Sequence, residues 1–207
     1  VYNGEIYNFK DLACSYKLKN IYSDTDLLWN FLKDKRFEGL SSEIDGMWAF
    51  AFANLENKTL TLCRDRFGQK PLYYAYLPEG KGFVFASNIS TLLRLMGNKP
   101  ILNEAKLDQY IRFGYRSMFS GSSETFIRDV YTMNPSSYLT INQFLQEDEK
   151  QLFENLKEQD PSIKADEAVE HIDFLLNKAI ASTLVSDRPC SVLLSGGIDS
   201  SLIYHIA

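Results

Sequence analysis

Apolar residues at helical spacing predict one clear helix near the beginning of the chain. Ser23 precedes its apolar stripe and Asp26 follows at the spacing of a capping box, so the helix is expected to begin there. A shorter helix is expected before it, with Asn8 as N-cap and Asp11 in its first turn, after a strand-turn over residues 2–7. The stripe of the longer helix consists of Leu27, Leu28, Phe31 and Leu32.

Between residues 46 and 87 the helical period gives way to short apolar runs and alternation, which is typical of strands. Residues 54–58 form a turn between the first two runs, and residues 67–71 form the next turn. Because no helix separates the runs, they predict an antiparallel meander rather than a βαβ unit. The expected strands cover residues 47–53, 59–64, 72–76 and 83–86.

Two further helices and one strand complete this first region, and a run rich in acidic residues and lysine follows it. Such a run predicts a solvated linker, here over residues 145–165. We therefore place a first domain at residues 1–144. The remaining elements expected in it are helices over 89–96 and 104–113, the second capped by Asn103, and a strand over 137–141.

Beyond the linker the pattern is that of an α/β unit. A long amphipathic helix precedes a short apolar strand over residues 191–194, which continues into a glycine-rich turn and a second helix. We place the start of a second domain at residues 166–207. The apolar positions of the long helix are Val169, Ile172, Leu176, Ile180 and Leu184.

Composition and charge exclude several function classes. The formal net charge is −5 with no long basic run, which argues against a nucleic acid partner. No apolar stretch approaches the roughly 18 residues of a membrane span and no signal peptide opens the chain, so we expect no membrane partner and a cytoplasmic location. The three cysteines are too few and too scattered for a disulfide framework or a zinc site.

The strongest chemical motif is the glycine-rich turn, Ser-Gly-Gly-Ile-Asp-Ser at residues 195–200. Two glycines let backbone N–H groups approach a ligand closely, the hydroxyls of Ser195 and Ser200 add donors, and a helix N-terminus favours an anion. Asp199 beside a phosphate predicts a bound Mg²⁺ between them. The motif lacks the Gly-Lys-Ser/Thr of a Walker loop, and an ordinary glycine-rich turn is the alternative interpretation.

A second motif, Asn3-Gly4-Glu5, is by itself an Asn-Gly turn. An asparagine amide and a glycine N–H can together form an oxyanion hole, and Glu5 can bind a substrate ammonium. Asp24 is a candidate second carboxylate, although a helix start alone also accounts for this stretch. The run Arg64-Asp65-Arg66-Phe67-Gly68-Gln69-Lys70-Pro71-Leu72-Tyr73-Tyr74 is interpreted as a charged hairpin turn between two strands rather than as catalytic.

Taken together and in this order, the motifs resemble the glutamine-hydrolysing asparagine synthetases. Residues 195–201 are similar to the pyrophosphate loop of the N-type ATP pyrophosphatases that form the second domain of that family. The segments similar to its class II glutamine amidotransferase domain are residues 2–8, 23–26, 45–51, 64–74 and 85–87.

The resemblance implies an α+β fold, an Ntn-hydrolase-type αββα sandwich of antiparallel sheets, followed by the start of an α/β domain. It implies that Asn3 and Gly4 form the oxyanion hole and that Asn3, Gly4, Glu5 and Asp24 bind glutamine. It further implies that ammonia amidates aspartate through β-aspartyl-AMP, with ATP, Mg²⁺ on Asp199, and a possible homodimer. The residues implied to bind ATP and pyrophosphate are Leu194, Ser195, Gly196, Gly197, Asp199 and Ser200.

The chain departs from the family at the nucleophile. The cysteine that attacks glutamine and the early arginine that binds the glutamine carboxylate are absent, and both are expected upstream of Val1. Neither the two histidines nor the three cysteines are expected to replace them. We therefore expect a fragment that lacks both ends and hydrolyses no glutamine alone. The residues set aside are Cys14, Cys63, Cys190, His171 and His205.

Three alternatives remain open at this point. The same chemistry with another acceptor carboxylate, such as a surface-polysaccharide sugar acid, is one, because the acceptor pocket is expected beyond Ala207. A relative without glutaminase activity is the second, and a non-catalytic binding module is the third. Retention of Glu5 and Asp24 argues against the second, and the glycine-rich loop argues against the third.

Overall fold

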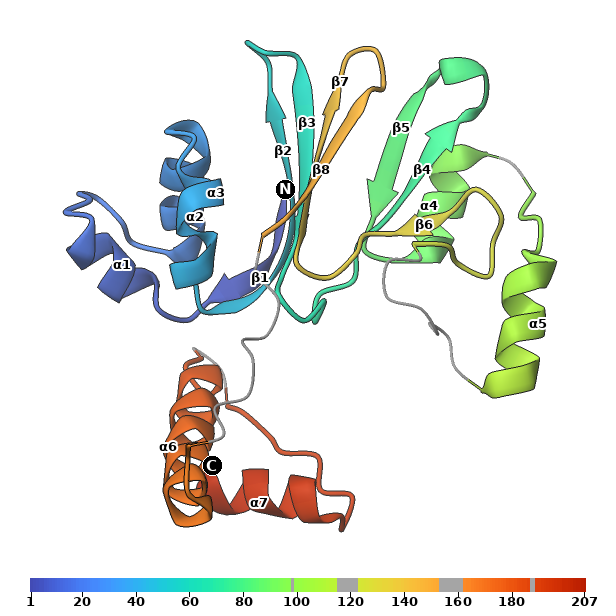
Figure 1. The fold of residues 1–207 in the computed structure, drawn as a ribbon. Coiled ribbons are helices and arrows are strands. Elements are labelled where there is room, and N and C mark those ends of the chain that lie inside the picture. The colour runs from blue at the N-terminus through green and yellow to red at the C-terminus, as the bar shows by residue number, and fades with distance from the viewer. Residues whose placement is uncertain (98, 115–122, 153–161, 187–188) are drawn as a thin grey trace.

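The computed structural model describes residues 1–97, 99–114, 123–152, 162–186 and 189–207. It consists of two antiparallel sheets with helices on their outer sides, and a separate helical part at the C-terminal end (Figure 1). The strands are β1 (Tyr2–Ile6), β2 (Gly46–Asn54), β3 (Thr59–Arg64), β4 (Tyr73–Leu77), β5 (Gly82–Ala86), β6 (Tyr131–Thr132), β7 (Ser137–Asn142) and β8 (Glu147–Gln151). The α-helices are α1 (Phe9–Ser15), α2 (Asp24–Lys33), α3 (Phe37–Leu40), α4 (Ile89–Met96), α5 (Glu104–Phe113), α6 (Ala165–Thr183) and α7 (Ile198–Ile206).

The two sheets form the inner layers of a four-layer sandwich. The larger sheet has the strand order β1-β2-β3-β7-β8 and the smaller one β5-β4-β6, and all their pairings are antiparallel. Helices α1, α2 and α3 lie outside the larger sheet, and α4 and α5 lie beyond the smaller one (Figure 1). This arrangement confirms the predicted α+β sandwich.

Strand β2 shows why the sequence folds into these layers. Side chains alternate along a strand, so Trp48 and Phe50 point into the core beneath the helices, while Ala49 and Ala51 point toward the other sheet. There the small alanines pack beside Tyr74 of β4. The large residues of β2 therefore pack against the helical layer, and its small residues allow the two sheets to pack face to face.

The predicted hairpins are confirmed, but the continuous meander is wrong. Strand β3 pairs with β2 and β7 rather than with β4, and residues 65–72 cross from one sheet to the other. The physical cause lies in Asp65, whose side chain is fully buried. Its Oδ1 accepts from the backbone N–H of Phe67 and Gln69 at 3.0 and 2.9 Å, and its Oδ2 from those of Trp48 and Lys70 at 3.2 and 3.0 Å.

Arg64 fixes the same crossing from the other side. Its guanidinium donates to the carbonyl oxygens of Gly68, Lys70 and Met133, each at 2.7 Å. Half-burial lowers the pKa of Arg64, but its ordinary value is so high that the group stays charged at neutral pH. The charged run around Phe67 is thus a structural crossing that both side chains hold in shape.

Helix starts were predicted with mixed success. Ser23 caps α2 in a complete capping box with Asp26, and Asn103 caps α5 by accepting from the N–H of Lys106. Asn8 precedes α1 as expected, but the prediction that its side chain caps the helix is wrong. That side chain instead donates to the carbonyl of Glu43 at 2.8 Å and accepts from the N–H of Asp45 at 3.0 Å.

Residues 147–151, expected at the start of the linker, form strand β8. This strand pairs with β7 and lies at the edge of the larger sheet, with all its residues exposed. Charged side chains on an edge strand commonly prevent its pairing with other chains. Because these residues are not apolar, the strand could not be predicted from the pattern of apolar positions. The middle of the expected linker, residues 153–161, lies outside the described residues.

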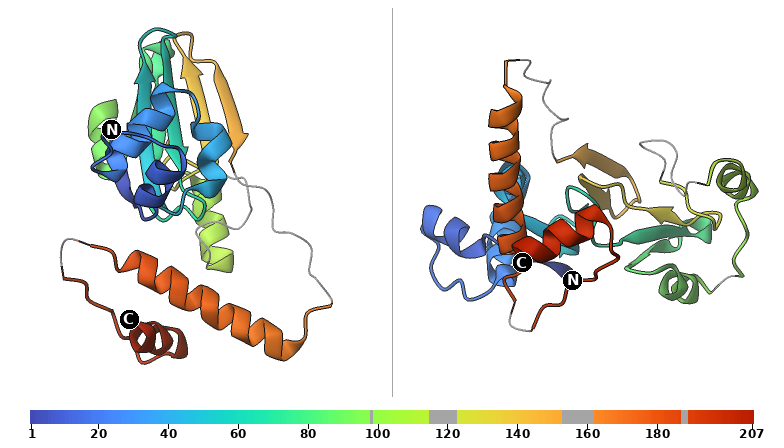
Figure 2. Two further views of the ribbon diagram at one scale, coloured as in Figure 1. Left: turned by 90° about the vertical axis from the view of Figure 1, so that its left-hand side faces the viewer. Right: turned by 90° about the horizontal axis from the view of Figure 1, so that it is seen from below.

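The C-terminal part contains the predicted long helix α6 and the final helix α7, which lie beside each other and outside the sandwich (Figure 2). Residues 191–194 are not a strand, which corrects that prediction. A strand needs a hydrogen-bonded neighbour, and none pairs with this segment in the described part of the chain. No described helix is both long and apolar enough to cross a membrane.

Candidate functional site

A pocket of about 450 Å³ lies where strand β1 and the N-terminus of α2 meet. Gly4, Glu5 and Asp24 line it together, although Asp24 follows Glu5 by 19 positions along the chain. Asn3 belongs to the same strand and is exposed, but it does not line this pocket. The structure thus brings together three of the four residues predicted for glutamine.

Gly4 is required by the close approach of two strands. It faces Trp48 across the β1–β2 pair, and a Cβ atom on Gly4 would lie 2.2 Å from the carbonyl oxygen of Met47 and 2.7 Å from the Cα of Trp48. Both neighbours are backbone atoms and cannot turn aside. Only glycine therefore allows β1 to pair with β2 at this position.

Asp24 is held at the start of α2 by hydrogen bonds to one of its oxygens. Oδ2 accepts from the hydroxyl of Tyr2 at 2.8 Å and from the backbone N–H of Ile6 at 3.1 Å. The only other described contact is a long one, 3.4 Å, between Oδ1 and the hydroxyl of Thr25. The carboxylate is therefore anchored through Oδ2, and Oδ1 has capacity for a ligand.

The electrostatics of the pocket favour a positively charged group in the ligand. Glu5 is half-buried, and no hydrogen bond or ion pair links its carboxylate to another described residue. Asp24 supplies a second carboxylate, and Lys10 is at the rim with its Nζ 5.7 Å from the ring centre of Phe9. Burial and the nearby Glu5 raise the pKa of Tyr7, which also lines the pocket, so its phenol stays protonated. Two carboxylates around one pocket suit a substrate ammonium.

Sequence reasoning missed the contribution of Tyr2, Tyr7 and Lys10 to this region. Tyr2 was grouped with the first strand, and nothing in its neighbours signals a bond to a residue 22 positions away. Tyr7 and Lys10 line the pocket because β1 ends beside the N-terminus of α1. Only the fold places these side chains next to Asp24.

The glycine-rich loop forms a compact turn before α7. Gly196 has φ of +82°, a conformation that favours glycine, and Gly197 precedes the first residue of the helix. The hydroxyls of Ser195 and Ser200 lie 3.0 Å apart, and the N–H of Gly197 donates to the Ser195 hydroxyl at 3.3 Å. Asp199 is in the first turn of α7, and residues 195–199 of the loop are exposed, while Ser200 is partly buried.

The cysteines and histidines do not build a site among the described residues. Cys63 is fully buried, burial raises the pKa of its thiol, and the indole N–H of Trp48 donates to its sulfur at 3.3 Å. A buried thiol of this kind is unreactive. Cys14 and Cys190 are exposed and form no disulfide, and the described residues contain no cluster of three or more metal-ligating side chains.

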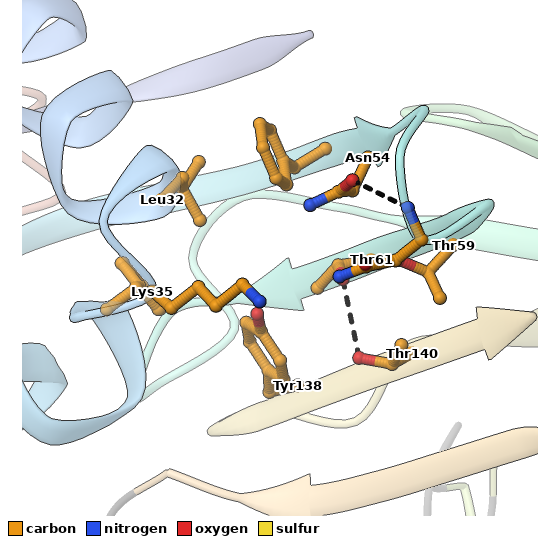
Figure 3. Close-up of a pocket in the computed structure, with 10 residues that line it drawn as sticks. Leu32, Lys35, Asn54, Thr59, Thr61, Tyr138 and Thr140 are labelled. Carbon is orange, nitrogen blue, oxygen red and sulfur yellow. Dashed lines mark hydrogen bonds between the residues drawn. The ribbon is translucent and has the colours of Figure 1, made fainter.

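A second hollow, of about 250 Å³, lies between the C-terminal end of α2 and strands β2, β3 and β7 (Figure 3). None of the functional-site residues predicted from the sequence lines it. Its polar groups pair with one another, since the hydroxyls of Thr61 and Thr140 lie 3.3 Å apart and Asn54 Oδ1 accepts from the N–H of Asn57 at 3.0 Å. We assign no role to this hollow.

The class of protein follows from the family that the sequence of the sandwich matches. A model of the glutamine amidotransferase domain family matches residues 1–152, and the chain belongs to that family. Residues 171–207 match a second family model, described as asparagine synthase. The resemblance to glutamine-hydrolysing asparagine synthetases is therefore confirmed over most of the chain.

Relatives that match almost the whole chain are named as glutamine-hydrolysing asparagine synthetases. A probable glutamine-hydrolysing asparagine synthetase of Acanthamoeba polyphaga mimivirus is 31% identical over 99% of this chain and 35% of its own length. Asparagine synthetase 1 of Bacillus subtilis is 32% identical over 100% of this chain and 32% of its own. The human asparagine synthetase is 24% identical over 98% of this chain and 34% of its own. The chain thus spans about a third of the length of these relatives.

Among solved structures, the chain is similar to a glutamine phosphoribosylpyrophosphate amidotransferase from B. subtilis complexed with ADP and GMP. The TM-score is 0.50 at 16% sequence identity, and the match covers 99% of this chain and 42% of that one. At this identity the likeness concerns the fold. It agrees with the two-sheet sandwich described above.

Proposed function

We propose that this chain is part of a cytoplasmic, ATP-dependent asparagine synthetase that hydrolyses glutamine to ammonia and amidates aspartate through β-aspartyl-AMP. The observation that carries the proposal is the pocket that Gly4, Glu5 and Asp24 share. The relatives that match almost the whole chain are named for the same reaction, which supports the proposal. A homodimer, common in this family, is part of the proposal.

In the proposed glutaminase half, Glu5 and Asp24 bind the ammonium group of glutamine. The amide of Asn3 and the N–H of Gly4 stabilise the oxyanion that forms when a thiolate attacks the side-chain carbonyl. The thiolate is proposed to come from outside residues 1–207, since Cys14, Cys63 and Cys190 do not line the pocket. The arginine for the glutamine carboxylate is proposed to lie outside this range too.

In the proposed synthetase half, the loop of residues 194–200 binds the pyrophosphate of ATP. Gly196, Gly197 and the N-terminus of α7 present N–H groups, Ser195 and Ser200 present hydroxyls, and the backbone of Leu194 contacts the nucleotide. Asp199 fits a magnesium ion, because Mg²⁺ is commonly held by one or two carboxylates together with substrate phosphates. When bound, the ion neutralises phosphate charge.

We propose two domains for the chain, a first one of strands and helices and the beginning of a second. The pairing of β8 with β7 supports an end of the first domain after β8 rather than at residue 144. The second domain is proposed to begin at residue 166 as expected, one residue after the start of α6. The linker between them is proposed to be correspondingly shorter.

Asp24→Asn tests the proposed glutamine site. The substitution keeps the side-chain volume and removes the charge that faces the substrate ammonium, so we expect the KM for glutamine in the full-length protein to rise about 30-fold. Activity with ammonia in place of glutamine is expected to stay unchanged. Asp34→Asn is the matched control, because Asp34 lies at the other end of α2 and does not line the pocket. An unchanged KM for glutamine in Asp24→Asn would contradict the proposed site.

Asp199→Asn tests the proposed pyrophosphate loop. Loss of the carboxylate is expected to weaken binding of Mg²⁺-ATP and to slow formation of AMP on the order of 100-fold, because metal assistance contributes several kcal/mol to such reactions. Calorimetric titration with Mg²⁺-ATP measures the binding and AMP release measures the rate. Asp173→Asn, an exposed position on α6, is the control. Equal Mg²⁺-ATP affinity in Asp199→Asn and the wild type would count against the assignment.

A further inference from the structure

The hydroxyl of Tyr2 reaches the proposed glutamine site through a hydrogen bond to Asp24. It lies on the side of β1 that faces the helices, where its ring packs against the core that contains Ile6 and Leu27. It does not line the pocket that holds Gly4, Glu5 and Asp24. Its hydroxyl nevertheless donates to Asp24 Oδ2 at 2.8 Å. The hydrogen bond to this carboxylate is therefore the direct link between the Tyr2 hydroxyl and the pocket.

The two carboxylate oxygens of Asp24 differ in their hydrogen bonds. Oδ2 accepts both the Tyr2 hydroxyl and the backbone N–H of Ile6, so donors from the two ends of β1 hold it. Oδ1 makes only the long contact with Thr25 among the described residues. Because an aspartate side chain otherwise rotates about two bonds, two donors on one oxygen determine where the other one points.

The hydroxyl of Tyr2 remains a donor over the whole neutral range. Burial, the hydrogen bond to Asp24 and the charge of the same carboxylate all raise the pKa of Tyr2. The phenol of Tyr2 therefore keeps its proton throughout this range. The bond is consequently a charge-assisted one, in the class that stabilises more than a bond between neutral groups.

We propose that Tyr2 is a positioning residue for substrate binding, which orients the carboxylate of Asp24 so that Oδ1 accepts the ammonium group of glutamine. The inference rests on the proposed function of the pocket and adds a residue to it that makes no contact with substrate. It predicts that the Tyr2 hydroxyl matters for ligands that carry the ammonium and not for ligands that lack it.

Tyr2→Phe in the full-length protein tests the proposal. The substitution retains the ring and its packing and removes only the donor, so we expect the KM for glutamine to rise about 10-fold while kcat changes less than twofold. The inhibition constant of glutaramic acid, which is glutamine without its α-amino group, is expected to stay within twofold of the wild type. Activity with ammonia is expected to stay unchanged.

Tyr16→Phe is the matched control. The hydroxyl of Tyr16 donates to Glu43 Oε1 at 2.7 Å, so this variant also removes a bond from a tyrosine to a carboxylate. Tyr16 packs beside Phe31 in the same helical layer, but neither it nor Glu43 lines the pocket. We expect its KM for glutamine and its inhibition by glutaramic acid to match the wild type.

The possible results separate this inference from the proposed function. If Asp24→Asn raises the KM for glutamine and Tyr2→Phe does not, the positioning role is wrong and the site stands. A Tyr2→Phe variant that loses affinity for glutamine and glutaramic acid equally also overturns the role. A general loss of order in the pocket would then explain the weaker binding. A double variant no worse than Asp24→Asn supports the role, since the two changes then act on one interaction. If Asp24→Asn has no effect, or the full-length protein does not hydrolyse glutamine, both the site and the role fall.

Discussion

Gly4→Ala is expected to separate strand β1 from β2 and to abolish the proposed glutaminase activity. The added Cβ would lie 2.2 Å from the Met47 carbonyl oxygen and 2.7 Å from the Trp48 Cα, and neither strand can yield without breaking the ladder. Overpacking of this kind costs about 3 kcal/mol. The same shift moves the N–H of Gly4 and the carboxylate of Glu5, so we expect activity with glutamine to fall more than about 100-fold.

Urea unfolding followed by tryptophan fluorescence measures the loss of stability, because Trp48 is buried directly opposite Gly4. Gly39→Ala is the matched control. A Cβ on Gly39 meets no atom within 4 Å, and this residue lies in helix α3, where alanine is favoured over glycine. We expect the control to be as stable as the wild type or slightly more stable. A Gly4→Ala protein with unchanged stability and activity would show that β1 and β2 do not approach as described.

Asp65→Ala is expected to be the most destabilising single substitution at a charged residue of the sandwich. Four backbone N–H groups, those of Trp48, Phe67, Gln69 and Lys70, donate to this fully buried carboxylate. Removing it takes this acceptor away from all four donors, and each buried donor that stays unsatisfied costs about 1–3 kcal/mol. Partial entry of water reduces the total, so we expect a loss of about 4 kcal/mol.

Asp148→Ala is the control for this substitution, because Asp148 is an exposed residue of the edge strand β8. Its only described ion pair, with Lys150 at 3.6 Å, is solvent-exposed and contributes little. Thermal and urea unfolding of the two variants give the comparison. Similar stabilities would mean that the crossing between the sheets does not depend on the Asp65 carboxylate.

The parts of the fold that local physics determines could be predicted from the sequence. The capping box of Ser23 and Asp26 requires only neighbours within one helical turn, and it places α2 correctly. The alternation of large residues and alanines in β2 likewise reports a strand buried on both faces. Asn8 shows the limit of such reasoning, since its side chain has two partners more than 30 positions away and bonds to them instead of capping α1.

The division of the strands between two sheets could not be predicted from the pattern of the strands. A turn within one sheet and a crossing between two sheets need similar residues, and the difference depends on where β7 inserts. Strand β8 was missed for a related reason. It is stabilised by its ladder with β7 and carries no apolar face of its own.

The candidate site was predictable as a set of residues but not as an arrangement. Glu5 and Asp24 were identified by their motifs, and the fold places them at one pocket. The role inferred for Tyr2 depends on an oxygen that accepts donors from both ends of β1, which no local pattern reports. A side chain that acts through another residue lies at no characteristic spacing from it along the sequence. The structure is therefore needed to find such residues.

Transfer of labelled nitrogen from glutamine tests the central claim most directly. The full-length protein would be incubated with glutamine carrying ¹⁵N in its side-chain amide, together with aspartate, ATP and Mg²⁺. We expect ¹⁵N in the side-chain amide of asparagine, with glutamate, AMP and pyrophosphate formed in equal amounts. Release of AMP without asparagine would contradict aspartate as the acceptor. Asparagine formed from ammonia but never from glutamine would contradict the role proposed for the pocket of Glu5 and Asp24.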